Sequence, residues 1–233
     1  MLTELLKKKR EGRERFESLL NQGAIEVTKP IMQEFETLMT YYKCAIMEAE
    51  TKLRVLNEEF SLQHDRNPIS VIKTRLKKLD SIKEKLDRDD FPFTIESIEK
   101  NLSDIAGVRV ICAFPDDVYY VAETLLSQDD VILLSRKDYI ANPKPNGYRS
   151  LHLIVAIPVF MANEKRMVKV EIQLRTISMD SWASLEHQLR YKKKNEFTDS
   201  MADELYRCAQ ISAELDARMG ALKDLVEVHQ QEK

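Results

Sequence analysis

Two stretches near the middle of the chain alternate between apolar and polar residues, which is the period of half-buried β-strands. The first covers residues 151–158 and the second covers residues 168–175. A short polar link around residues 161–165 separates them, and Asn146-Gly147 just before the first stretch is a turn signal. We therefore expect two antiparallel strands joined as a hairpin, each with one face buried.

The polar faces of these two strands carry chemically varied side chains. On the second strand the apolar residues Val168, Val170, Ile172 and Leu174 alternate with the polar residues Lys169, Glu171, Gln173 and Arg175. If the polar faces coincide, residues whose numbers sum to about 323 are paired, which sets His152 beside Glu171, Ser150 beside Gln173 and Tyr148 beside Arg175. A solvated sheet face is the alternative interpretation, but this variety of groups suits a nucleotide better than water.

Helical periodicity dominates both ends of the chain. After Pro30, apolar residues recur at intervals of three and four, and this predicts a long amphipathic helix with a stripe of Ile31, Phe35, Leu38, Tyr42, Ile46, Ala49, Leu53, Leu56 and Phe60. Residues 2–20 predict a charged helix, and residues 115–126 and 182–191 two shorter ones. The last helix has near-heptad spacing at Met201, Leu205, Cys208, Ser212, Leu215, Met219, Leu222 and Val226. This stripe either docks on the domain or forms an oligomer interface.

Further strands complete a mixed sheet. Residues 69–77 alternate after the break at Asn67-Pro68, residues 104–114 form a buried strand, and residues 131–134 form a short one. The strand, helix, strand order around residues 115–126 favours a mixed sheet. We therefore predict an α/β (α+β) fold of about five strands flanked by helices. Its parts are an N-terminal helical extension (1–66), a central domain (67–195) and a C-terminal helix (196–233).

Composition narrows the class of protein. With 233 residues, of which 43% are hydrophobic, the chain can bury one core with helical additions. No apolar run approaches the roughly 20 residues that span a bilayer, and the N-terminus is polar, so we expect a cytoplasmic protein. The cysteines Cys44, Cys112 and Cys208 are too scattered for a disulfide framework or a zinc site, and we expect them to be small buried side chains.

Charge is distributed unevenly along the chain. The net charge of −3 argues against non-specific nucleic-acid binding by the whole surface. The basic run at residues 7–10 is explained by a solvated helix, and RNA or partner contact is the less favoured alternative. Residues 73–88 hold seven basic and three acidic side chains, a local net of +4. Arg75 and Lys77 share a strand face and Lys85 and Arg88 a helical turn, so four cations can converge on one polyphosphate, unless this is only a solvated face.

The usual glycine-rich phosphate-binding motifs are absent. The chain has neither GxxxxGK[ST] nor GxGxxG and only five glycines, so arginine and lysine side chains must hold any phosphate. Two carboxylates, Asp104 and Glu171, belong to predicted strands and could hold Mg²⁺ together with substrate phosphates, although Asp104 could simply cap a turn. His64-Asp65 is similar to a dipeptide of metal-dependent phosphohydrolases. With four histidines in all and none upstream, we assign it to a loop and expect no hydrolase activity.

Four ordered motifs resemble the synthetase domain of RelA/SpoT proteins. They are residues 104–109 (DIAGVR), 144–152 (KPNGYRSLH), 170–176 (VEIQLRT) and 182–187 (WASLEH). The resemblance is strong over residues 69–191 and extends to the terminal helices by arrangement. Because no hydrolase or regulatory domain accompanies these motifs, the chain looks like a stand-alone small alarmone synthetase of bacteria.

The resemblance implies an activity and a fold. The activity is transfer of the β,γ-pyrophosphate of ATP to the 3′-hydroxyl of GDP or GTP, giving ppGpp or pppGpp and AMP. The family fold is a nucleotidyltransferase-like mixed sheet, and members commonly form homotetramers. By motif, Arg75, Lys77, Lys85, Arg88 and Arg109 are expected to bind ATP, and Asp104 to hold Mg²⁺. Glu171 is expected to join the metal site or act on the 3′-hydroxyl, and the motifs leave open which carboxylate is the base.

The acceptor site follows in the same way. The resemblance implies that Tyr148 stacks on guanine, with Lys144, Arg149, His152, Gln173 and Arg175 around the acceptor. Stacking discriminates poorly among bases, so guanine selection needs a hydrogen-bonding group. As a hypothesis we assign this to Asp180, whose carboxylate can accept from N1–H and the 2-amino group. Its alternative role is that of a first-turn helix carboxylate near Ser178.

Some features depart from related proteins. Lys137 stands where some members carry Arg, and the N-terminal helices differ among subfamilies, so no product-activated allosteric site is carried over. The motifs do not rank GMP, GDP and GTP as acceptors. Two alternative functions remain at this stage: a nucleotidyltransferase with another acceptor, and a catalytically silent nucleotide- or RNA-binding module. The presence of both Asp104 and Glu171 disfavours the silent module.

Overall fold

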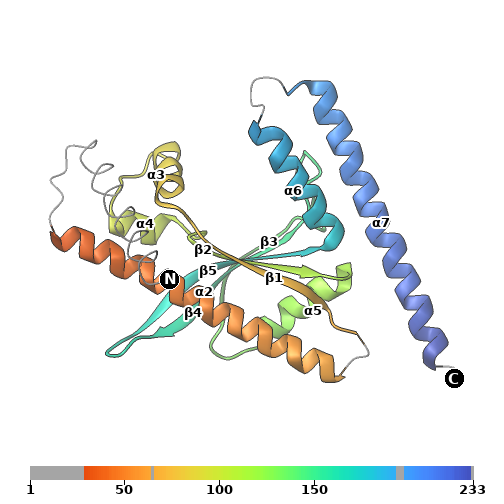
Figure 1. The fold of residues 1–233 in the computed structure, drawn as a ribbon, viewed down its shortest axis with the longest axis horizontal. Helices are drawn as coiled ribbons and strands as arrows, with labels where there is room; N and C mark the ends of the chain where they lie inside the picture. Colours follow the sequence, from red (N-terminus) through yellow and green to blue (C-terminus); the bar gives the residue numbers. More distant parts are fainter. Residues whose placement is uncertain (1–28, 64–65, 193–196, 232–233) are drawn as a thin grey trace, which may run out of the picture.

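Five strands form a mixed sheet in the computed structural model of the chain, which describes residues 29–63, 66–192 and 197–231 (Figure 1). The strands are β1 (Ile69–Leu76), β2 (Ala106–Cys112), β3 (Ile132–Asp138), β4 (Leu151–Phe160) and β5 (Lys165–Thr176), in the order β1-β2-β5-β4-β3. β2 and β5 are parallel, and the other neighbours are antiparallel. The predicted mixed sheet with flanking helices is confirmed.

The described helices are α2 (Lys29–Gln63), α3 (Leu79–Arg88), α4 (Ile95–Asn101), α5 (Pro115–Leu126), α6 (Ile177–Lys192) and α7 (Asp199–Gln231). α2 crosses one face of the sheet, while α7 runs along one side of the molecule beside α6 (Figure 1). α6 begins at Ile177, five residues before its expected start at 182, and α4 was not predicted because seven residues are too few to show a helical period. None of the helices in the described ranges combines the length and apolar character needed to span a bilayer.

The core lies between the sheet and α2. Every stripe residue predicted for this helix from Phe35 to Phe60 is buried, whereas the side chain of Ile31 lies outside the described part. The apolar faces of β4 and β5 are buried against the same helix and α5: Leu151, Leu153, Val155, Ile157, Val168, Val170, Ile172 and Leu174. Alternation then places the polar residues of both strands on the opposite face of the sheet. The division into parts at residues 66/67 and 195/196 stays a prediction.

The register of the hairpin differs from the expected one by two residues. His152 pairs with Gln173, and Glu171 pairs with Ile154, so the pairings proposed from the sequence are wrong. Side-chain alternation has a period of two and therefore cannot distinguish registers that differ by two. The hairpin connection decides: Phe160 pairs with Lys165, and Met161 N donates to Glu164 O across the loop. The sequence analysis correctly predicted which side chains share the polar face of the hairpin, because a register shift of two residues leaves every side chain on the same face.

Two predicted segments lie outside the described residues, and the prediction of buried cysteines is only partly confirmed. The predicted helix at residues 2–20 and the loop at His64-Asp65 lie outside the described residues. Cys112 is buried and Cys44 half-buried, as small core side chains should be, but Cys208 is exposed. Cys208 belongs to the part of the predicted α7 stripe that is exposed, although Leu205 of the same stripe is buried.

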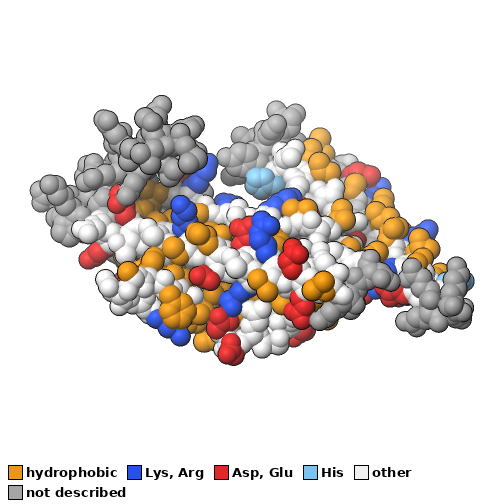
Figure 2. All heavy atoms as spheres, turned by 60° about the horizontal axis from the view of Figure 1, so that its bottom comes forward, with side chains coloured by type: hydrophobic (Ala, Val, Ile, Leu, Met, Phe, Trp, Pro, Cys, Tyr) orange, Lys and Arg blue, Asp and Glu red, His pale blue; other side chains and the backbone are white. Residues whose placement is uncertain are grey.

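Helix α7 docks through a narrower face than its heptad pattern suggests. Leu205, Ala209 and Asp216 are buried, whereas Met201, Leu215, Met219, Leu222 and Val226 of the predicted stripe are each about half exposed. Figure 2 shows hydrophobic side chains along the side of the molecule that α7 occupies. The predicted stripe therefore docks on the domain at Leu205, and its other apolar residues named here are left exposed.

Gly147 closes the turn before β4. Its φ is +86°, and its N–H donates to Lys144 O at 2.8 Å. A Cβ here would lie 2.4 Å from the Cβ of Ala209 on α7. We expect Gly147→Ala to lower the free energy of unfolding by about 1–3 kcal/mol, because an alanine is strained at positive φ and helix α7 blocks its methyl group.

Gly220 provides the matched control for this substitution. It lies within α7, and a Cβ added there meets nothing within 4 Å. Gly220→Ala should therefore stabilise the protein by about 0.5–1 kcal/mol. Denaturant unfolding of both variants measures the difference, and equal stabilities would show that the Gly147 turn is not constrained by its backbone or by α7.

Candidate functional site

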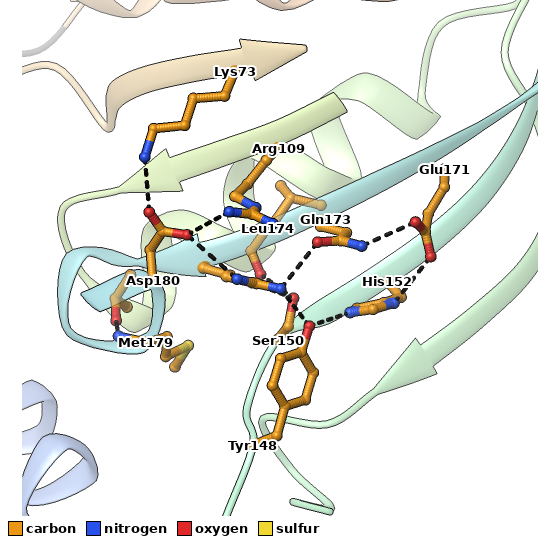
Figure 3. A network of polar contacts seen from close by, with 12 residues as sticks. Lys73, Arg109, Tyr148, Ser150, His152, Glu171, Gln173, Leu174, Met179 and Asp180 are labelled. Atoms are coloured by element: carbon orange, nitrogen blue, oxygen red, sulfur yellow. Dashed lines mark hydrogen bonds and ion pairs between the residues drawn. The ribbon is translucent and has the colours of Figure 1, made fainter. Parts of the chain in front are cut away.

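The polar face of the hairpin carries a continuous hydrogen-bonded network (Figure 3). His152 Nδ1 lies 3.3 Å from Glu171 Oε1, and the Nε2 atom of the same ring lies 2.8 Å from the hydroxyl of Tyr148. Gln173 Nε2 donates to the other carboxylate oxygen of Glu171 at 2.9 Å. Although His152 is not directly opposite Glu171 in the ladder, diagonal neighbours on one sheet face lie within reach of long side chains.

Arg175 connects this network to helix α6. Its guanidinium is buried and donates to the Tyr148 hydroxyl, to Gln173 Oε1 at 3.0 Å and to Ser150 Oγ at 3.4 Å. It also pairs with Asp180 Oδ1 at 3.3 Å, in the first turn of α6. A buried cation with this many partners is held in one orientation.

Asp180 collects three cations. Lys73 of β1 reaches its Oδ2 at 3.0 Å, and Arg109 of β2 reaches Oδ1 at 3.1 Å, beside Arg175. Burial alone would raise the pKa of Asp180, but the hydrogen bond from Lys73 and the charges of Arg109 and Arg175 outweigh it and hold the pKa below its ordinary value. The cluster keeps a net charge of +2 from three cations and one carboxylate, which favours an anionic ligand.

A second charged cluster surrounds Asp104, just before β2. Lys77 Nζ donates to Oδ2 at 2.7 Å, and Lys85 Nζ of α3 lies 2.9 Å from Oδ1. Burial would raise the pKa of Asp104, but both lysines outweigh it and lower that pKa. The carboxylate is therefore ionised near neutral pH.

Glu171 is also ionised. Burial favours its neutral form, but the hydrogen bond and charge of His152 and the hydrogen bond from Gln173 lower its pKa below the ordinary value of 4.5. The negative charge of Asp104 opposes this shift, so the two carboxylates act on each other electrostatically. Glu171 lies on β5 and Asp104 just before the neighbouring parallel strand β2, in which Gly107 pairs with Glu171.

Comparison with known proteins assigns the chain to a family. Residues 74–196 match the model of the region found in RelA/SpoT proteins, and this match contains both carboxylates and the whole hairpin. The chain belongs to the RelA/SpoT family. The sequence resemblance is thus confirmed at the level of the family.

Individual relatives of this RelA/SpoT chain are similar over most of their length. GTP pyrophosphokinase YwaC of Bacillus subtilis is 42% identical over 199 residues, 85% of this chain and 95% of the relative. GTP pyrophosphokinase YjbM of the same organism is 34% identical over 195 residues, 84% of this chain and 91% of the relative. The matched region is nearly the whole of each relative, which agrees with the predicted resemblance to stand-alone synthetases.

Solved structures agree with the fold. The small alarmone synthetase 2 of B. subtilis matches with a TM-score of 0.75 and 41% identity, over 82% of this chain and 98% of that one. The small alarmone synthetase 1 of B. subtilis, solved bound to its product pppGpp, matches with a TM-score of 0.76 and 34% identity, over 83% and 98% of the two chains. The RelA/SpoT chain therefore shares its mixed sheet and helical additions with these enzymes.

The structure brings most of the predicted RelA/SpoT site residues together. Glu171, His152, Tyr148, Gln173 and Arg175 form one network, with Arg109 and Asp180 at its end. Lys144 Nζ lies 4.9 Å from the centre of the Tyr148 ring. These contacts place the predicted acceptor residues, apart from Arg149, on one surface.

Three predicted residues lie apart from these contacts. Arg75 is exposed on β1, and Arg88 is exposed and pairs with Asp89 at 3.2 Å, whereas Lys77 and Lys85 contact Asp104. The expected convergence of these four cations on one polyphosphate stays a prediction. Arg149 has the opposite parity to Tyr148, and its charge acts on Tyr119 and Asp216 of the helices α5 and α7. Alternation along the chain before β4 would have shown this for Arg149.

Two further residues of the RelA/SpoT site were not assigned from the sequence. Lys73 belongs to the basic run and shares its strand face with Arg75, so parity was an available signal for its contact with Asp180. Tyr139 follows β3, and its ring packs edge-on against His152 with centroids 5.3 Å apart, while Lys144 Nζ lies 4.6 Å from its centre. Nothing in the local pattern around Tyr139 indicates this contact, because it depends on how β3 pairs with β4.

Proposed function

We propose that the chain is a (p)ppGpp synthetase that transfers the β,γ-pyrophosphate of ATP to the 3′-hydroxyl of GDP or GTP, giving ppGpp or pppGpp and AMP. The observation that carries this proposal is the ionised, half-buried Glu171 held by His152 and Gln173 on an open sheet face, with cations on both sides. Family membership and relatives described as GTP pyrophosphokinases support the same reaction.

In the proposed reaction the 3′-oxygen of the acceptor attacks the β-phosphorus of ATP. The bond from that phosphorus to the bridging α,β-oxygen breaks, and AMP leaves. Glu171 accepts the proton of the 3′-hydroxyl, which requires hydrogen-bond reach more than a raised pKa. His152 and Gln173 fix both carboxylate oxygens and so orient the base. Much of the rate then comes from holding the two nucleotides in line and neutralising phosphate charge.

The residues around Asp104 fit a Mg²⁺ ion. Oδ1 of Asp104 is buried, and the contact recorded for it is the ion pair with Lys85 Nζ at 2.9 Å, so a cation at this oxygen would take the place of that ammonium group. No cluster of three or more His, Cys, Asp or Glu ligands is found in the described part of the chain, so the ion would rely on Asp104, Glu171, substrate phosphates and water, as Mg²⁺ commonly does. When bound, Mg²⁺ would neutralise charge on the transferred phosphates. Lys77 and Lys85 would turn from Asp104 toward the same phosphates.

Asp180 supplies a prediction about base selection. Within the described part of the chain, the contact recorded for its Oδ2 is with Lys73, whose side chain is 54% exposed, so this pair can open for N1–H and the 2-amino group of guanine. We expect Asp180→Asn to reduce the preference for GDP over IDP about tenfold, because the lost acceptor is worth roughly 1–3 kcal/mol in a buried site. The measurement is kcat/KM for both acceptors. An unchanged ratio would leave Asp180 with its alternative role as a helix-start carboxylate that neutralises Arg109 and Arg175.

We further propose a homo-oligomer, expected to be a tetramer, and a cytoplasmic location. The half-exposed stripe of α7, from Leu215 to Val226, supports an interface because large apolar surfaces of this kind commonly meet another chain.

Chromatography of nucleotides tests the reaction. Purified protein is incubated with labelled ATP, GDP and Mg²⁺, and AMP together with a guanosine carrying a 3′-diphosphate is the expected result. Release of pyrophosphate instead of AMP would indicate nucleotidyl transfer to another acceptor. No turnover while ATP and GDP both bind would indicate a silent binding module, and either outcome would overturn the proposal.

A further inference from the structure

Helix α7 is attached to the domain at separate points along its length. Near its start, Trp182 Nε1 donates to Leu205 O at 3.0 Å within a small apolar cluster that includes Ala209. Near its end, Lys223 pairs with Asp116 of α5. Between these points lies Asp216, a carboxylate that is only 5% exposed. Apolar and surface contacts are enough to dock a helix, so a buried acid in the middle of the docking face needs another explanation.

Asp216 holds the junction between β5 and α6. Its Oδ2 accepts from Thr176 Oγ1 at 2.8 Å, and Ser178 is a second hydroxyl donor. The same Thr176 Oγ1 accepts from Met179 N at 3.1 Å, so one hydroxyl joins the end of a strand, the start of a helix and α7. Thr176 directly follows Arg175, and Met179 directly precedes Asp180. The contact between Arg175 and Asp180 is therefore built across the junction that Asp216 fixes.

The same helix supports the opposite wall of the acceptor site. Tyr148 packs against the cluster of Trp182, Leu205 and Ala209, and the Gly147 turn touches α7 so closely that no Cβ fits between them. By contrast, Asp104 pairs with Lys77, just after β1, and with Lys85 of α3, and Figure 1 shows α3 on the other side of the molecule from α7. Besides its contacts with α5 and α6, helix α7 thus packs against Tyr148, which is proposed to bind guanine.

We propose that Asp216 is a positioning residue for the acceptor nucleotide, which acts by fixing Thr176 and with it the relative placement of Arg175 and Asp180. The inference rests on the proposed function, since it concerns the same site. It extends the acceptor site to a helix that none of the four sequence motifs reaches. Burial raises the pKa of Asp216, although the hydrogen bonds from Thr176 and Ser178 and the charge of Arg149 act in the opposite direction.

Three variants separate positioning from simple docking. Asp216→Leu removes both acceptor oxygens, Asp216→Asn keeps one that Thr176 can use, and Lys223→Met removes an attachment of the same helix at its other end. We expect Asp216→Leu to raise the KM for GDP about tenfold, the cost of a mispositioned hydrogen-bonding group, with the KM for ATP changed less than about twofold. Asp216→Asn should recover most of the affinity for GDP, and Lys223→Met should leave both KM values near wild type.

Several outcomes would overturn the inference. Equal effects of Asp216→Leu on GDP and ATP, or equal effects of Asp216→Leu and Lys223→Met, would mean that α7 only stabilises the fold. If Asp216→Leu fails to fold, Thr176→Val tests the same hydrogen bond from its other end, with Thr176→Ser as the conservative control. Calorimetric titration of GDP and ATP into each variant measures affinity without turnover. A wild-type protein that produces no AMP contradicts the proposed function, whereas normal AMP formation with an unchanged KM for GDP in Asp216→Leu contradicts this inference alone.

Discussion

Glu171→Gln is expected to lower the rate of pyrophosphate transfer by about 10²–10⁴-fold, the usual contribution of a general base, while the protein stays folded. Glutamine fills the same space and keeps one oxygen that can accept from Gln173 or His152, but it cannot take the proton of the 3′-hydroxyl. The KM values for ATP and GDP should change much less than kcat. AMP formation under saturating nucleotides measures the rate, and circular dichroism checks the fold.

Glu164→Gln is the matched control for this variant. Glu164 lies in the loop of the same hairpin and accepts a hydrogen bond from Tyr41, outside the polar network. Its substitution should leave kcat within about twofold of wild type, as for a surface change away from the site. Near-wild-type turnover in Glu171→Gln would refute the role of the carboxylate as base.

The pH dependence of the wild-type rate gives an independent check on Glu171. Its folded-state pKa is depressed below 4.5, so the carboxylate is ionised above that pH and becomes protonated only as pH falls through the lowered value. A base must be ionised to accept a proton. If the wild-type rate falls at any pH above 4.5, titration of another group must cause that fall. The residual activity of Glu171→Gln should therefore show the same fall over the same pH range.

Hydrophobic periodicity predicted correctly which face of a single helix or strand is buried. The stripe of α2 from Phe35 to Phe60 and the alternation on β4 and β5 needed only the burial of a continuous apolar face, and both were predicted correctly. The hairpin register was not, because it depends on where the chain reverses between Phe160 and Lys165. The prediction that His152 lies beside Glu171 still holds, because both side chains are on the polar face of the sheet and are diagonal neighbours there.

Contacts between distant elements were harder to predict. Lys73, Arg109 and Asp180 come from β1, β2 and α6, and only the sheet order places β1 and β2 beside β5. The docking face of α7 could not be predicted either, since the heptad pattern predicts an apolar stripe but not which surface covers it. Asp216 interrupts an otherwise apolar face, so its burial follows from its bonds to Thr176 and Ser178 and not from its residue type.

Asp104→Asn is expected to lower the rate at least about 100-fold and to raise the Mg²⁺ concentration needed for half-maximal activity, because metal coordination is worth several kcal/mol in such sites. Asparagine keeps the shape of the side chain but loses the negative charge that draws a divalent cation. The measurement is a Mg²⁺ titration of AMP formation at saturating ATP and GDP. Asp87→Asn is the control: Asp87 is an exposed carboxylate on α3 that pairs with Lys83 at 2.7 Å, so its loss should change the rate less than about twofold.

The ion pairs of Asp104 with Lys77 and Lys85 suggest an alternative role for this carboxylate, which the same experiment tests. If Asp104 served only to neutralise Lys77 and Lys85, asparagine would release both ammonium groups toward the phosphates. ATP would then bind more tightly, with the Mg²⁺ requirement unchanged and the rate preserved. A lower KM for ATP with an unaltered Mg²⁺ titration would assign Asp104 to charge balance. A lost rate with a shifted Mg²⁺ titration would assign it to the metal, since freed lysines alone cannot produce that shift.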